Sequence, residues 1–197
     1  MIQKKIALFA FAFAALLAQI TQAQTLVHYW NFNDNSSVGT LLTPNVTLVS
    51  GASIAAIPGG ISAIDLGGTG QGFSNENLNA RNGDPAGTHL RFNDPIGGAL
   101  EFCLPTTGFT NVVIKFSTRR SGSGAGLQYW HYSTDGVNFE PFDTIAPNNG
   151  DPTLQVLDFS EVAGVDDNAD FKLRVTFAHG GGGNGGKKPF FNFSIDA

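Results

Sequence analysis

The sequence predicts an all-β protein, an antiparallel β-sandwich of the jelly-roll-like kind, on three observations. Several short runs alternate apolar and polar side chains with a period of two, which places successive side chains on opposite faces of a strand. Gly, Asn, Asp and Ser gather between these runs, as turns between short strands require. After residue 25, no long stretch has the 3.6-residue apolar period of a helix.

The segment Phe109–Phe142 shows this alternation most clearly. Trp130 and Tyr132 share one face of a predicted strand, and His131 lies on the other face. Asp135-Gly136 follows, and such a pair suits a two-residue turn because Gly takes positive φ freely and Asp tolerates it. We therefore expect a β-hairpin over Gln128–Phe142, with its tight turn at Asp135-Gly136.

Further strands of similar length are expected along the chain, giving about nine or ten in all. These are Thr25–Phe32, Ala99–Leu104, Thr153–Phe159, Phe171–Phe177 and Phe190–Asp196, and Ile61–Leu66 is a further candidate. Short strands at this spacing are typical of an antiparallel sandwich. Residues 24–197, with a hydrophobic content of 42% over the whole sequence, are expected to form a single domain with one core.

The N-terminal 23 residues have the three parts of a secretory signal peptide. Lys4 and Lys5 form a basic region, Ile6–Leu17 is apolar, and Thr21-Gln22-Ala23 offers a small-residue cleavage site. The alternative is a membrane anchor, but the apolar run is too short to span a bilayer comfortably. We expect a secreted or cell-surface protein that starts at Gln24 and has no membrane span after cleavage.

The net charge and the cysteine content limit which partners and cross-links we expect for this protein. Removing residues 1–23 takes the formal charge from −5 to −7, which argues against a nucleic-acid partner because such partners require a basic face. The single cysteine, Cys103, excludes an intramolecular disulfide. We expect Cys103 to be a small buried side chain on a strand, with a reactive thiol as the alternative.

A set of motifs recurs through the second half of the chain. They are Tyr132-Ser133-Thr134-Asp135-Gly136, Phe139, Asp158-Phe159-Ser160, Phe171–Val175 and Phe191–Ile195, with Tyr29–Asn33 as the first strand. In these residues the chain resembles a domain of secreted and surface proteins of environmental Gram-negative bacteria. The resemblance implies a jelly-roll-like sandwich that serves as an accessory module in adhesion, carbohydrate binding or surface display. This chain departs from the pattern at Phe191, where the family has Asp, and we expect it to differ as well in having no sorting domain of the kind that often follows.

No catalytic motif emerges from the residue spacing. The sequence has no HExxH, no phosphate-binding P-loop and no C-x-x-C, and Ser121–Gly126 lacks the glycines of a nucleophile elbow. The strongest candidate for a cofactor is calcium at Asp166, Asn168 and Asp170, whose alternating oxygen ligands suit this cation. The alternative, which we favour, is a solvated turn between two strands. We therefore predict that the protein is not an enzyme and has no certain cofactor.

Two classes of function remain open, with hydrolysis of a polysaccharide as a third. The first is a non-catalytic module that binds a glycan or a surface protein. Exposed aromatic and amide side chains would carry that binding, and the candidates on the faces opposite core residues are Tyr29, Tyr129, His131 and Asn192. The second is a structural extracellular or matrix protein without a small ligand, in which these side chains are ordinary surface or packing residues.

Overall fold

A computed structural model gives the structure of the protein. It describes residues 24–34, 36–58, 64–66, 78–85, 89–93, 95–122, 124–179 and 187–196, with the side chains of several residues in β4, β5 and β12 left out. The predicted signal peptide, residues 1–23, lies outside the described residues. No helix in the described part of the chain is long and apolar enough to cross a membrane.

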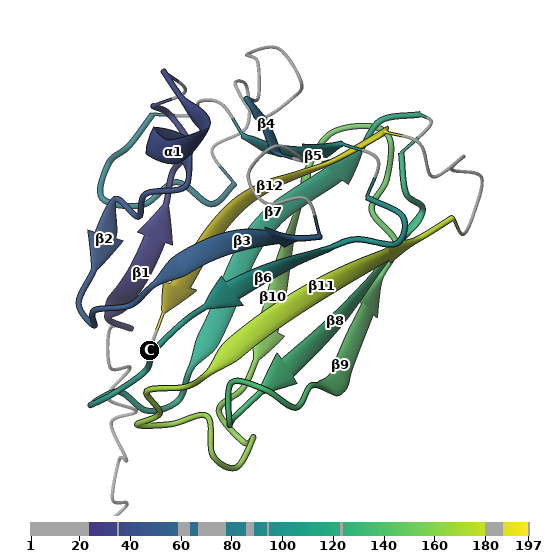
Figure 1. The fold of residues 1–197 in the computed structure, drawn as a ribbon. Coiled ribbons are helices and arrows are strands. Elements are labelled where there is room, and N and C mark those ends of the chain that lie inside the picture. Colours follow the sequence, from purple (N-terminus) through teal and green to yellow (C-terminus); the bar gives the residue numbers. More distant parts are fainter. Residues whose placement is uncertain are drawn as a thin grey trace, which may run out of the picture.

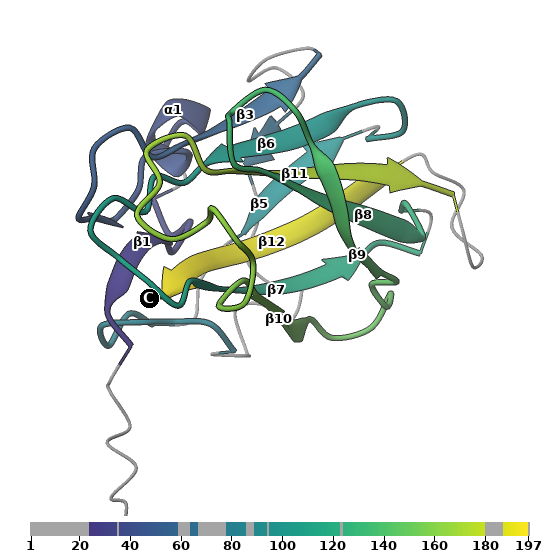
Figure 2. The same cartoon turned by 90° about the horizontal axis from the view of Figure 1, so that it is seen from below.

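Two sheets face one another across one core (Figures 1 and 2), and every strand pair recorded in the described ranges is antiparallel. The five-stranded sheet runs in the order β3 (Ser53–Ile57), β6 (Ala99–Cys103), β11 (Lys172–Ala178), β8 (Leu127–Ser133) and β9 (Glu140–Ile145). The predicted antiparallel, jelly-roll-like sandwich is confirmed.

The second sheet has seven strands and is built around β12. Its main path is β10 (Thr153–Asp158), β7 (Val113–Arg120), β12 (Lys187–Asp196), β1 (Leu26–Trp30) and β2 (Val46–Thr47). β5 (Leu90–Asn93) pairs with the first half of β12 and with β4 (Ile64–Leu66). One short helix, α1 (Val38–Leu41), follows β1, and the Ser37 side chain caps it by accepting a hydrogen bond from the Thr40 backbone N–H.

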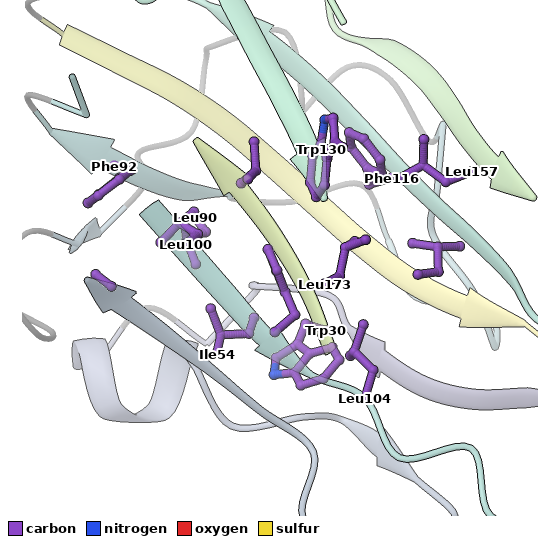
Figure 3. Close-up of a cluster of buried hydrophobic side chains, with 14 of the residues drawn as sticks. Trp30, Ile54, Leu90, Phe92, Leu100, Leu104, Phe116, Trp130, Leu157 and Leu173 are labelled. Atoms are coloured by element: carbon purple, nitrogen blue, oxygen red, sulfur yellow. The ribbon is translucent and has the colours of Figure 1, made fainter. Parts of the chain in front are cut away.

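Alternation along the strands separates the core from the surface. In β11, Leu173 and Val175 are fully buried between the sheets, while Arg174 and Thr176 are half-buried on the outer face. Across the core, Trp130 of β8 packs on Phe116 of β7 with 4.5 Å between ring centroids (Figure 3). Such aromatic pairs add to the free energy gained by burying their area, so this contact joins the two sheets.

The first strand differs from the prediction because both of its faces are covered. His28 is fully buried, and its Nε2–H donates to the Pro105 carbonyl over 2.8 Å. Tyr29 points to the outer face of the seven-stranded sheet, yet its exposed fraction is 0%. Residues 78–85 lie over that face, where the Arg81 backbone N–H donates to the Tyr29 hydroxyl over 3.1 Å. Tyr29 was therefore wrongly expected to reach the surface.

The central hairpin is confirmed, but its two-residue turn is not. β8 ends at Ser133 and β9 begins at Glu140, so residues 134–139 form a six-residue connection. The Asp135 Oδ1 atom accepts hydrogen bonds from the Ser133 hydroxyl and from the backbone N–H groups of Val137 and Asn138. An Asp that binds the backbone amides after it favours such a loop over continued strand pairing. Gly136 does take positive φ, at 73°.

Candidate functional site

The outer face of the five-stranded sheet presents one row of side chains that crosses all five strands. The strand register pairs Ile57 with Ala99, Ala99 with Thr176, Thr176 with Tyr129, and Tyr129 with Thr144. Strands lie about 4.8 Å apart, so this row extends over about 19 Å. In Figure 1 the same strands form the nearer layer, from β3 to β9.

A cavity of about 530 Å³ opens at the β8–β9 end of this row. Tyr129 and His131 of β8 line it together with Asp143 and Thr144 of β9 and Thr176 of β11. Tyr129 is the exposed aromatic side chain here, at 37%, because its neighbours along the strand, Gln128 and Trp130, point into the core. The cavity thus combines a flat ring with hydroxyl, carboxylate and imidazole groups.

The imidazole of His131 contacts the backbone of its own strand. Its Nδ1 atom lies 3.2 Å from the Tyr129 carbonyl oxygen. A carbonyl can only accept a hydrogen bond, so Nδ1 carries the proton and donates it. In neutral His131 the Nε2 atom is then an acceptor. A hydroxyl group of a ligand could donate to that nitrogen.

Three charged side chains form a cluster of ion pairs in the middle of the outer face of the five-stranded sheet. The Glu101 carboxylate accepts from Lys172 Nζ at 3.0 Å and from Arg174 Nη2 at 2.6 Å. Burial disfavours the charged form of Glu101, but the hydrogen bonds and charges of Arg174 and Lys172 outweigh it and hold its pKa below its usual value. Glu101 is therefore ionised at neutral pH.

Phe139 closes one end of the charged cluster. The connection between β8 and β9 folds onto the face, where the Arg174 guanidinium carbon lies 3.5 Å from the centroid of the Phe139 ring. This stacked cation–π contact, together with the Glu101 ion pair, fixes the guanidinium plane. The open part of the face is consequently the row through Thr176 and Tyr129.

A second cavity of about 380 Å³ lies at the β3–β6 end of the same row. Its walls come from the β3 end at Ile57 and Pro58, the β6 start at Gly97–Ala99, and Phe177. Arg174 and Thr176 supply its polar groups. Thr176 lines both cavities, so the two are neighbours along one face.

The structure brings together two of the four predicted binding residues. Tyr129 and His131 line the first cavity side by side, as their place opposite Trp130 implied. Tyr29 is buried in the other sheet. Asn192 pairs through its backbone with Ser117 in β12, and its side chain lies outside the described residues.

Sequence reasoning missed Thr176, Asp143, Arg174 and Ile57 as parts of the site. The alternation of Phe171–Phe177 already indicated that Arg174 and Thr176 lie on the face opposite the core. Their position beside Tyr129, however, depends on the pairing of β11 with β8, which the sequence does not state. The same holds for Ile57, which reaches the row through β6.

The predicted calcium residues form a hydrogen-bonded loop. The Asn168 Nδ2 group donates to the Thr134 carbonyl over 2.9 Å, and its Oδ1 atom accepts from the Asp170 backbone N–H over 2.6 Å. The described residues contain no group of three or more His, Cys, Asp or Glu side chains placed to hold a metal ion. Asn168 thus ties residues 164–170 to the β8–β9 connection, and calcium binding stays a prediction.

Comparison with known proteins finds likeness in solved structures alone. No family model matches the chain, and no curated protein matches it. A two-module structure of Clostridium thermocellum xylanase 10B, with its family 22 carbohydrate-binding module and xylohexaose, matches 87% of this chain with a TM-score of 0.49 and 11% identity. This chain spans 28% of that structure.

Two other solved structures are similar over different lengths. A family 29 carbohydrate-binding module matches 88% of this chain and 92% of its own, with 14% identity and a TM-score of 0.48. The K2 adhesin domain of Lys-gingipain matches 61% of this chain and 76% of its own, with 11% identity and a TM-score of 0.40. All three TM-scores are below 0.5, so the function proposed below rests on the side chains of this protein.

Proposed function

We propose that this protein binds a carbohydrate chain on the outer face of the five-stranded sheet and does not cleave it. One observation carries the proposal: the exposed ring of Tyr129 stands in an open cavity beside His131, Asp143 and Thr176. A sugar ring has an apolar C–H face and a rim of hydroxyl groups. Tyr129 suits the face, and the surrounding acceptors and donors suit the rim.

The charge of Glu101, at the centre of this face, supports binding over hydrolysis there. Glycoside hydrolysis requires a general acid, a carboxyl group whose pKa is raised so that it keeps its proton. On this face Glu101 has a lowered pKa because of Arg174 and Lys172. Asp34, Asp135 and Asp158, elsewhere in the described chain, have lowered pKa values as well, because nearby hydrogen-bond donors favour their charged forms.

The proposal includes export and a place outside the cell. It rests on the basic, apolar and small-residue segments of residues 1–23, in that order. The intact mass of the exported protein should correspond to a chain that begins at Gln24. A product that retains Lys4 and Lys5 would contradict export with cleavage.

Calorimetric titration of residues 24–197 with neutral oligosaccharides tests the binding. We expect Tyr129→Ala to lower the affinity about tenfold or more, equivalent to about 1.4 kcal/mol. Tyr129→Phe should retain most of the affinity because the ring remains. Val156→Ala, a change at a 52% exposed position on β10 of the other sheet, is the matched control and should bind like the parent.

Three outcomes would contradict the proposal. Unchanged affinity in Tyr129→Ala would remove the site from this face. Release of reducing sugar ends, lost on changing one carboxylate, would make the protein a hydrolase. Failure of every glycan on an array to bind would favour the alternative of a structural extracellular protein without a small ligand.

A further inference from the structure

We propose that the second cavity, at Ile57 and Ala99, receives an acetyl group carried by the bound glycan. This inference rests on the proposed function, because the acetyl group belongs to the same sugar chain that contacts Tyr129. It names a substrate class, acetyl-substituted polysaccharides, that the Tyr129 cavity alone would not select.

The side chains that line the cavity suit a small apolar substituent. Ala99 is the small residue of the cross-strand row, and it stands between Ile57 and Thr176. Ile57 is 42% exposed on β3, and Pro58 adds a second apolar side chain to the walls. A methyl group placed here would leave water for apolar contact, which favours binding.

The polar groups of the cavity fit a carbonyl oxygen. The Arg174 Nε and Nη2 atoms each donate one hydrogen bond to the Glu101 carboxylate, so the two Nη1 protons and the second Nη2 proton remain to donate to a ligand. The Thr176 hydroxyl lines the same cavity and can also donate. An acetyl group offers one carbonyl acceptor beside one methyl group, which matches these donors and walls.

A carboxylate fits the same place less well, although it too would accept from Arg174. The Arg174 charge is already paired with Glu101, at 2.6 Å. A second carboxylate would lose part of its hydration against Ile57 and Pro58, and this loss is costly for a charge without a new partner. The lining therefore favours a neutral acyl group over an acidic sugar.

The two cavities lie at a distance that one glycan can span. Tyr129 and Ala99 stand on β8 and β6, with β11 between them, so the strand spacing separates them by about 10 Å. Thr176 on β11 lines both cavities and leaves the face continuous. A sugar chain running across the strands would thus place the substituent one or two sugar units from the ring on Tyr129.

Two matched pairs of ligands test the inference and separate its two chemical sources. Acetylated xylan against the same xylan after alkaline deacetylation probes an O-acetyl group. N-acetylglucosamine hexamer against cellohexaose probes an N-acetyl group. We expect the protein to bind the acetylated member of at least one pair about tenfold more tightly, and Ile57→Thr to bind both members of that pair with equal affinity.

Leu154→Thr is the matched control, because Leu154 is 44% exposed on an edge strand of the other sheet. It should keep the preference. Ala99→Leu, which places a larger side chain in the cavity, should remove the preference for the acetylated ligand. This second variant replaces Ile57→Thr in the test if Ile57→Thr lowers the melting temperature. Equal affinity for both members of both pairs, or a preference that survives Ile57→Thr and Ala99→Leu, would overturn the acetyl inference. Absence of binding to these four ligands in a protein that binds another glycan would also overturn the acetyl inference, whereas failure of every glycan on the array as well would overturn the proposed function.

Discussion

Tyr29 and Tyr129 show what one residue's sequence context can predict and what it cannot. Both lie on alternating strands beside a buried tryptophan, and both were expected at the surface. Tyr129 is 37% exposed and Tyr29 is fully buried. The difference comes from residues 78–85, which cover the outer face of one sheet but not of the other. A loop about 50 residues away in the chain leaves no signal in the local pattern.

Because the Tyr29 hydroxyl is buried, we expect the free energy of unfolding to fall as the pH rises through the alkaline range. Burial raises its pKa from 10.0 to about 12, and the Asp84 carboxylate acts in the same direction. Between these two pKa values the folded state keeps the Tyr29 proton while the unfolded chain releases it. The contribution of Tyr29 to the free energy of unfolding is therefore complete below pH 10 and is lost between pH 10 and 12. In Tyr29→Phe that part of the pH dependence should be missing.

Urea unfolding of both proteins across this pH range measures the effect. The difference in unfolding free energy between the parent protein and Tyr29→Phe should shift in favour of the variant as the pH rises. Other titrating groups are common to both proteins and cancel in the comparison. A constant difference from pH 10 to 12 would show that Tyr29 ionises equally easily in the folded and unfolded states.

At the scale of single elements, alternation predicted the strands well and their connections poorly. In β11 the pattern predicted both faces correctly, including Leu173 inside and Arg174 outside. In the β8–β9 hairpin the Asp-Gly pair predicted a reversal at the right place but the wrong length. Asp135 binds the backbone amides of Val137 and Asn138, and this competition with strand pairing depends on side-chain geometry.

In the connection between β8 and β9, the backbone conformation at Gly136 disfavours a side chain. Its φ is +73°, and an added Cβ would lie 3.4 Å from the Asp170 carbonyl oxygen. Gly136→Val should therefore destabilise the protein by about 1–3 kcal/mol, because a β-branched residue is strained at positive φ. Gly122→Ala is the control, since a Cβ there meets no atom within 4 Å.

Thermal melting and chemical denaturation of the two variants provide the measurement. Gly136→Val should also weaken glycan binding if the loop holds Phe139 against Arg174, whereas Gly122→Ala should leave melting and binding unchanged. Equal melting midpoints for Gly136→Val and the parent protein would mean that the connection adapts without strain.

At the scale of the whole molecule, the sequence predicted a sandwich but not the order of its strands. β12, the last strand, lies between β7 and β1, so the sheet joins the two ends of the described chain. The row that forms the candidate site likewise combines residues from positions 57, 99, 129, 144 and 176. Such pairings link distant segments, and local patterns of hydrophobicity do not specify which strands become neighbours.

The contact that unites the two sheets gives the last prediction. Trp130 is fully buried and packs on Phe116 of the opposite sheet and on Phe102 of its own sheet, at 4.5 and 6.1 Å between ring centroids. Trp130→Ala leaves a cavity in the centre of the core and should cost about 3–5 kcal/mol of unfolding free energy. Tyr129→Ala, one residue earlier on the exposed face, should cost about 0.5 kcal/mol or less.

Urea denaturation followed by far-ultraviolet circular dichroism and by the fluorescence of the remaining tryptophan, Trp30, tests this contrast. Because both sheets share one core, we expect the two probes to report a single coincident transition in Trp130→Ala, shifted to lower urea. Trp30 reports the seven-stranded sheet, whereas Trp130 belongs to the five-stranded sheet. Separate transitions would show that the sheets unfold independently, and equal destabilisation by both substitutions would show that the inner and outer faces of β8 are assigned wrongly.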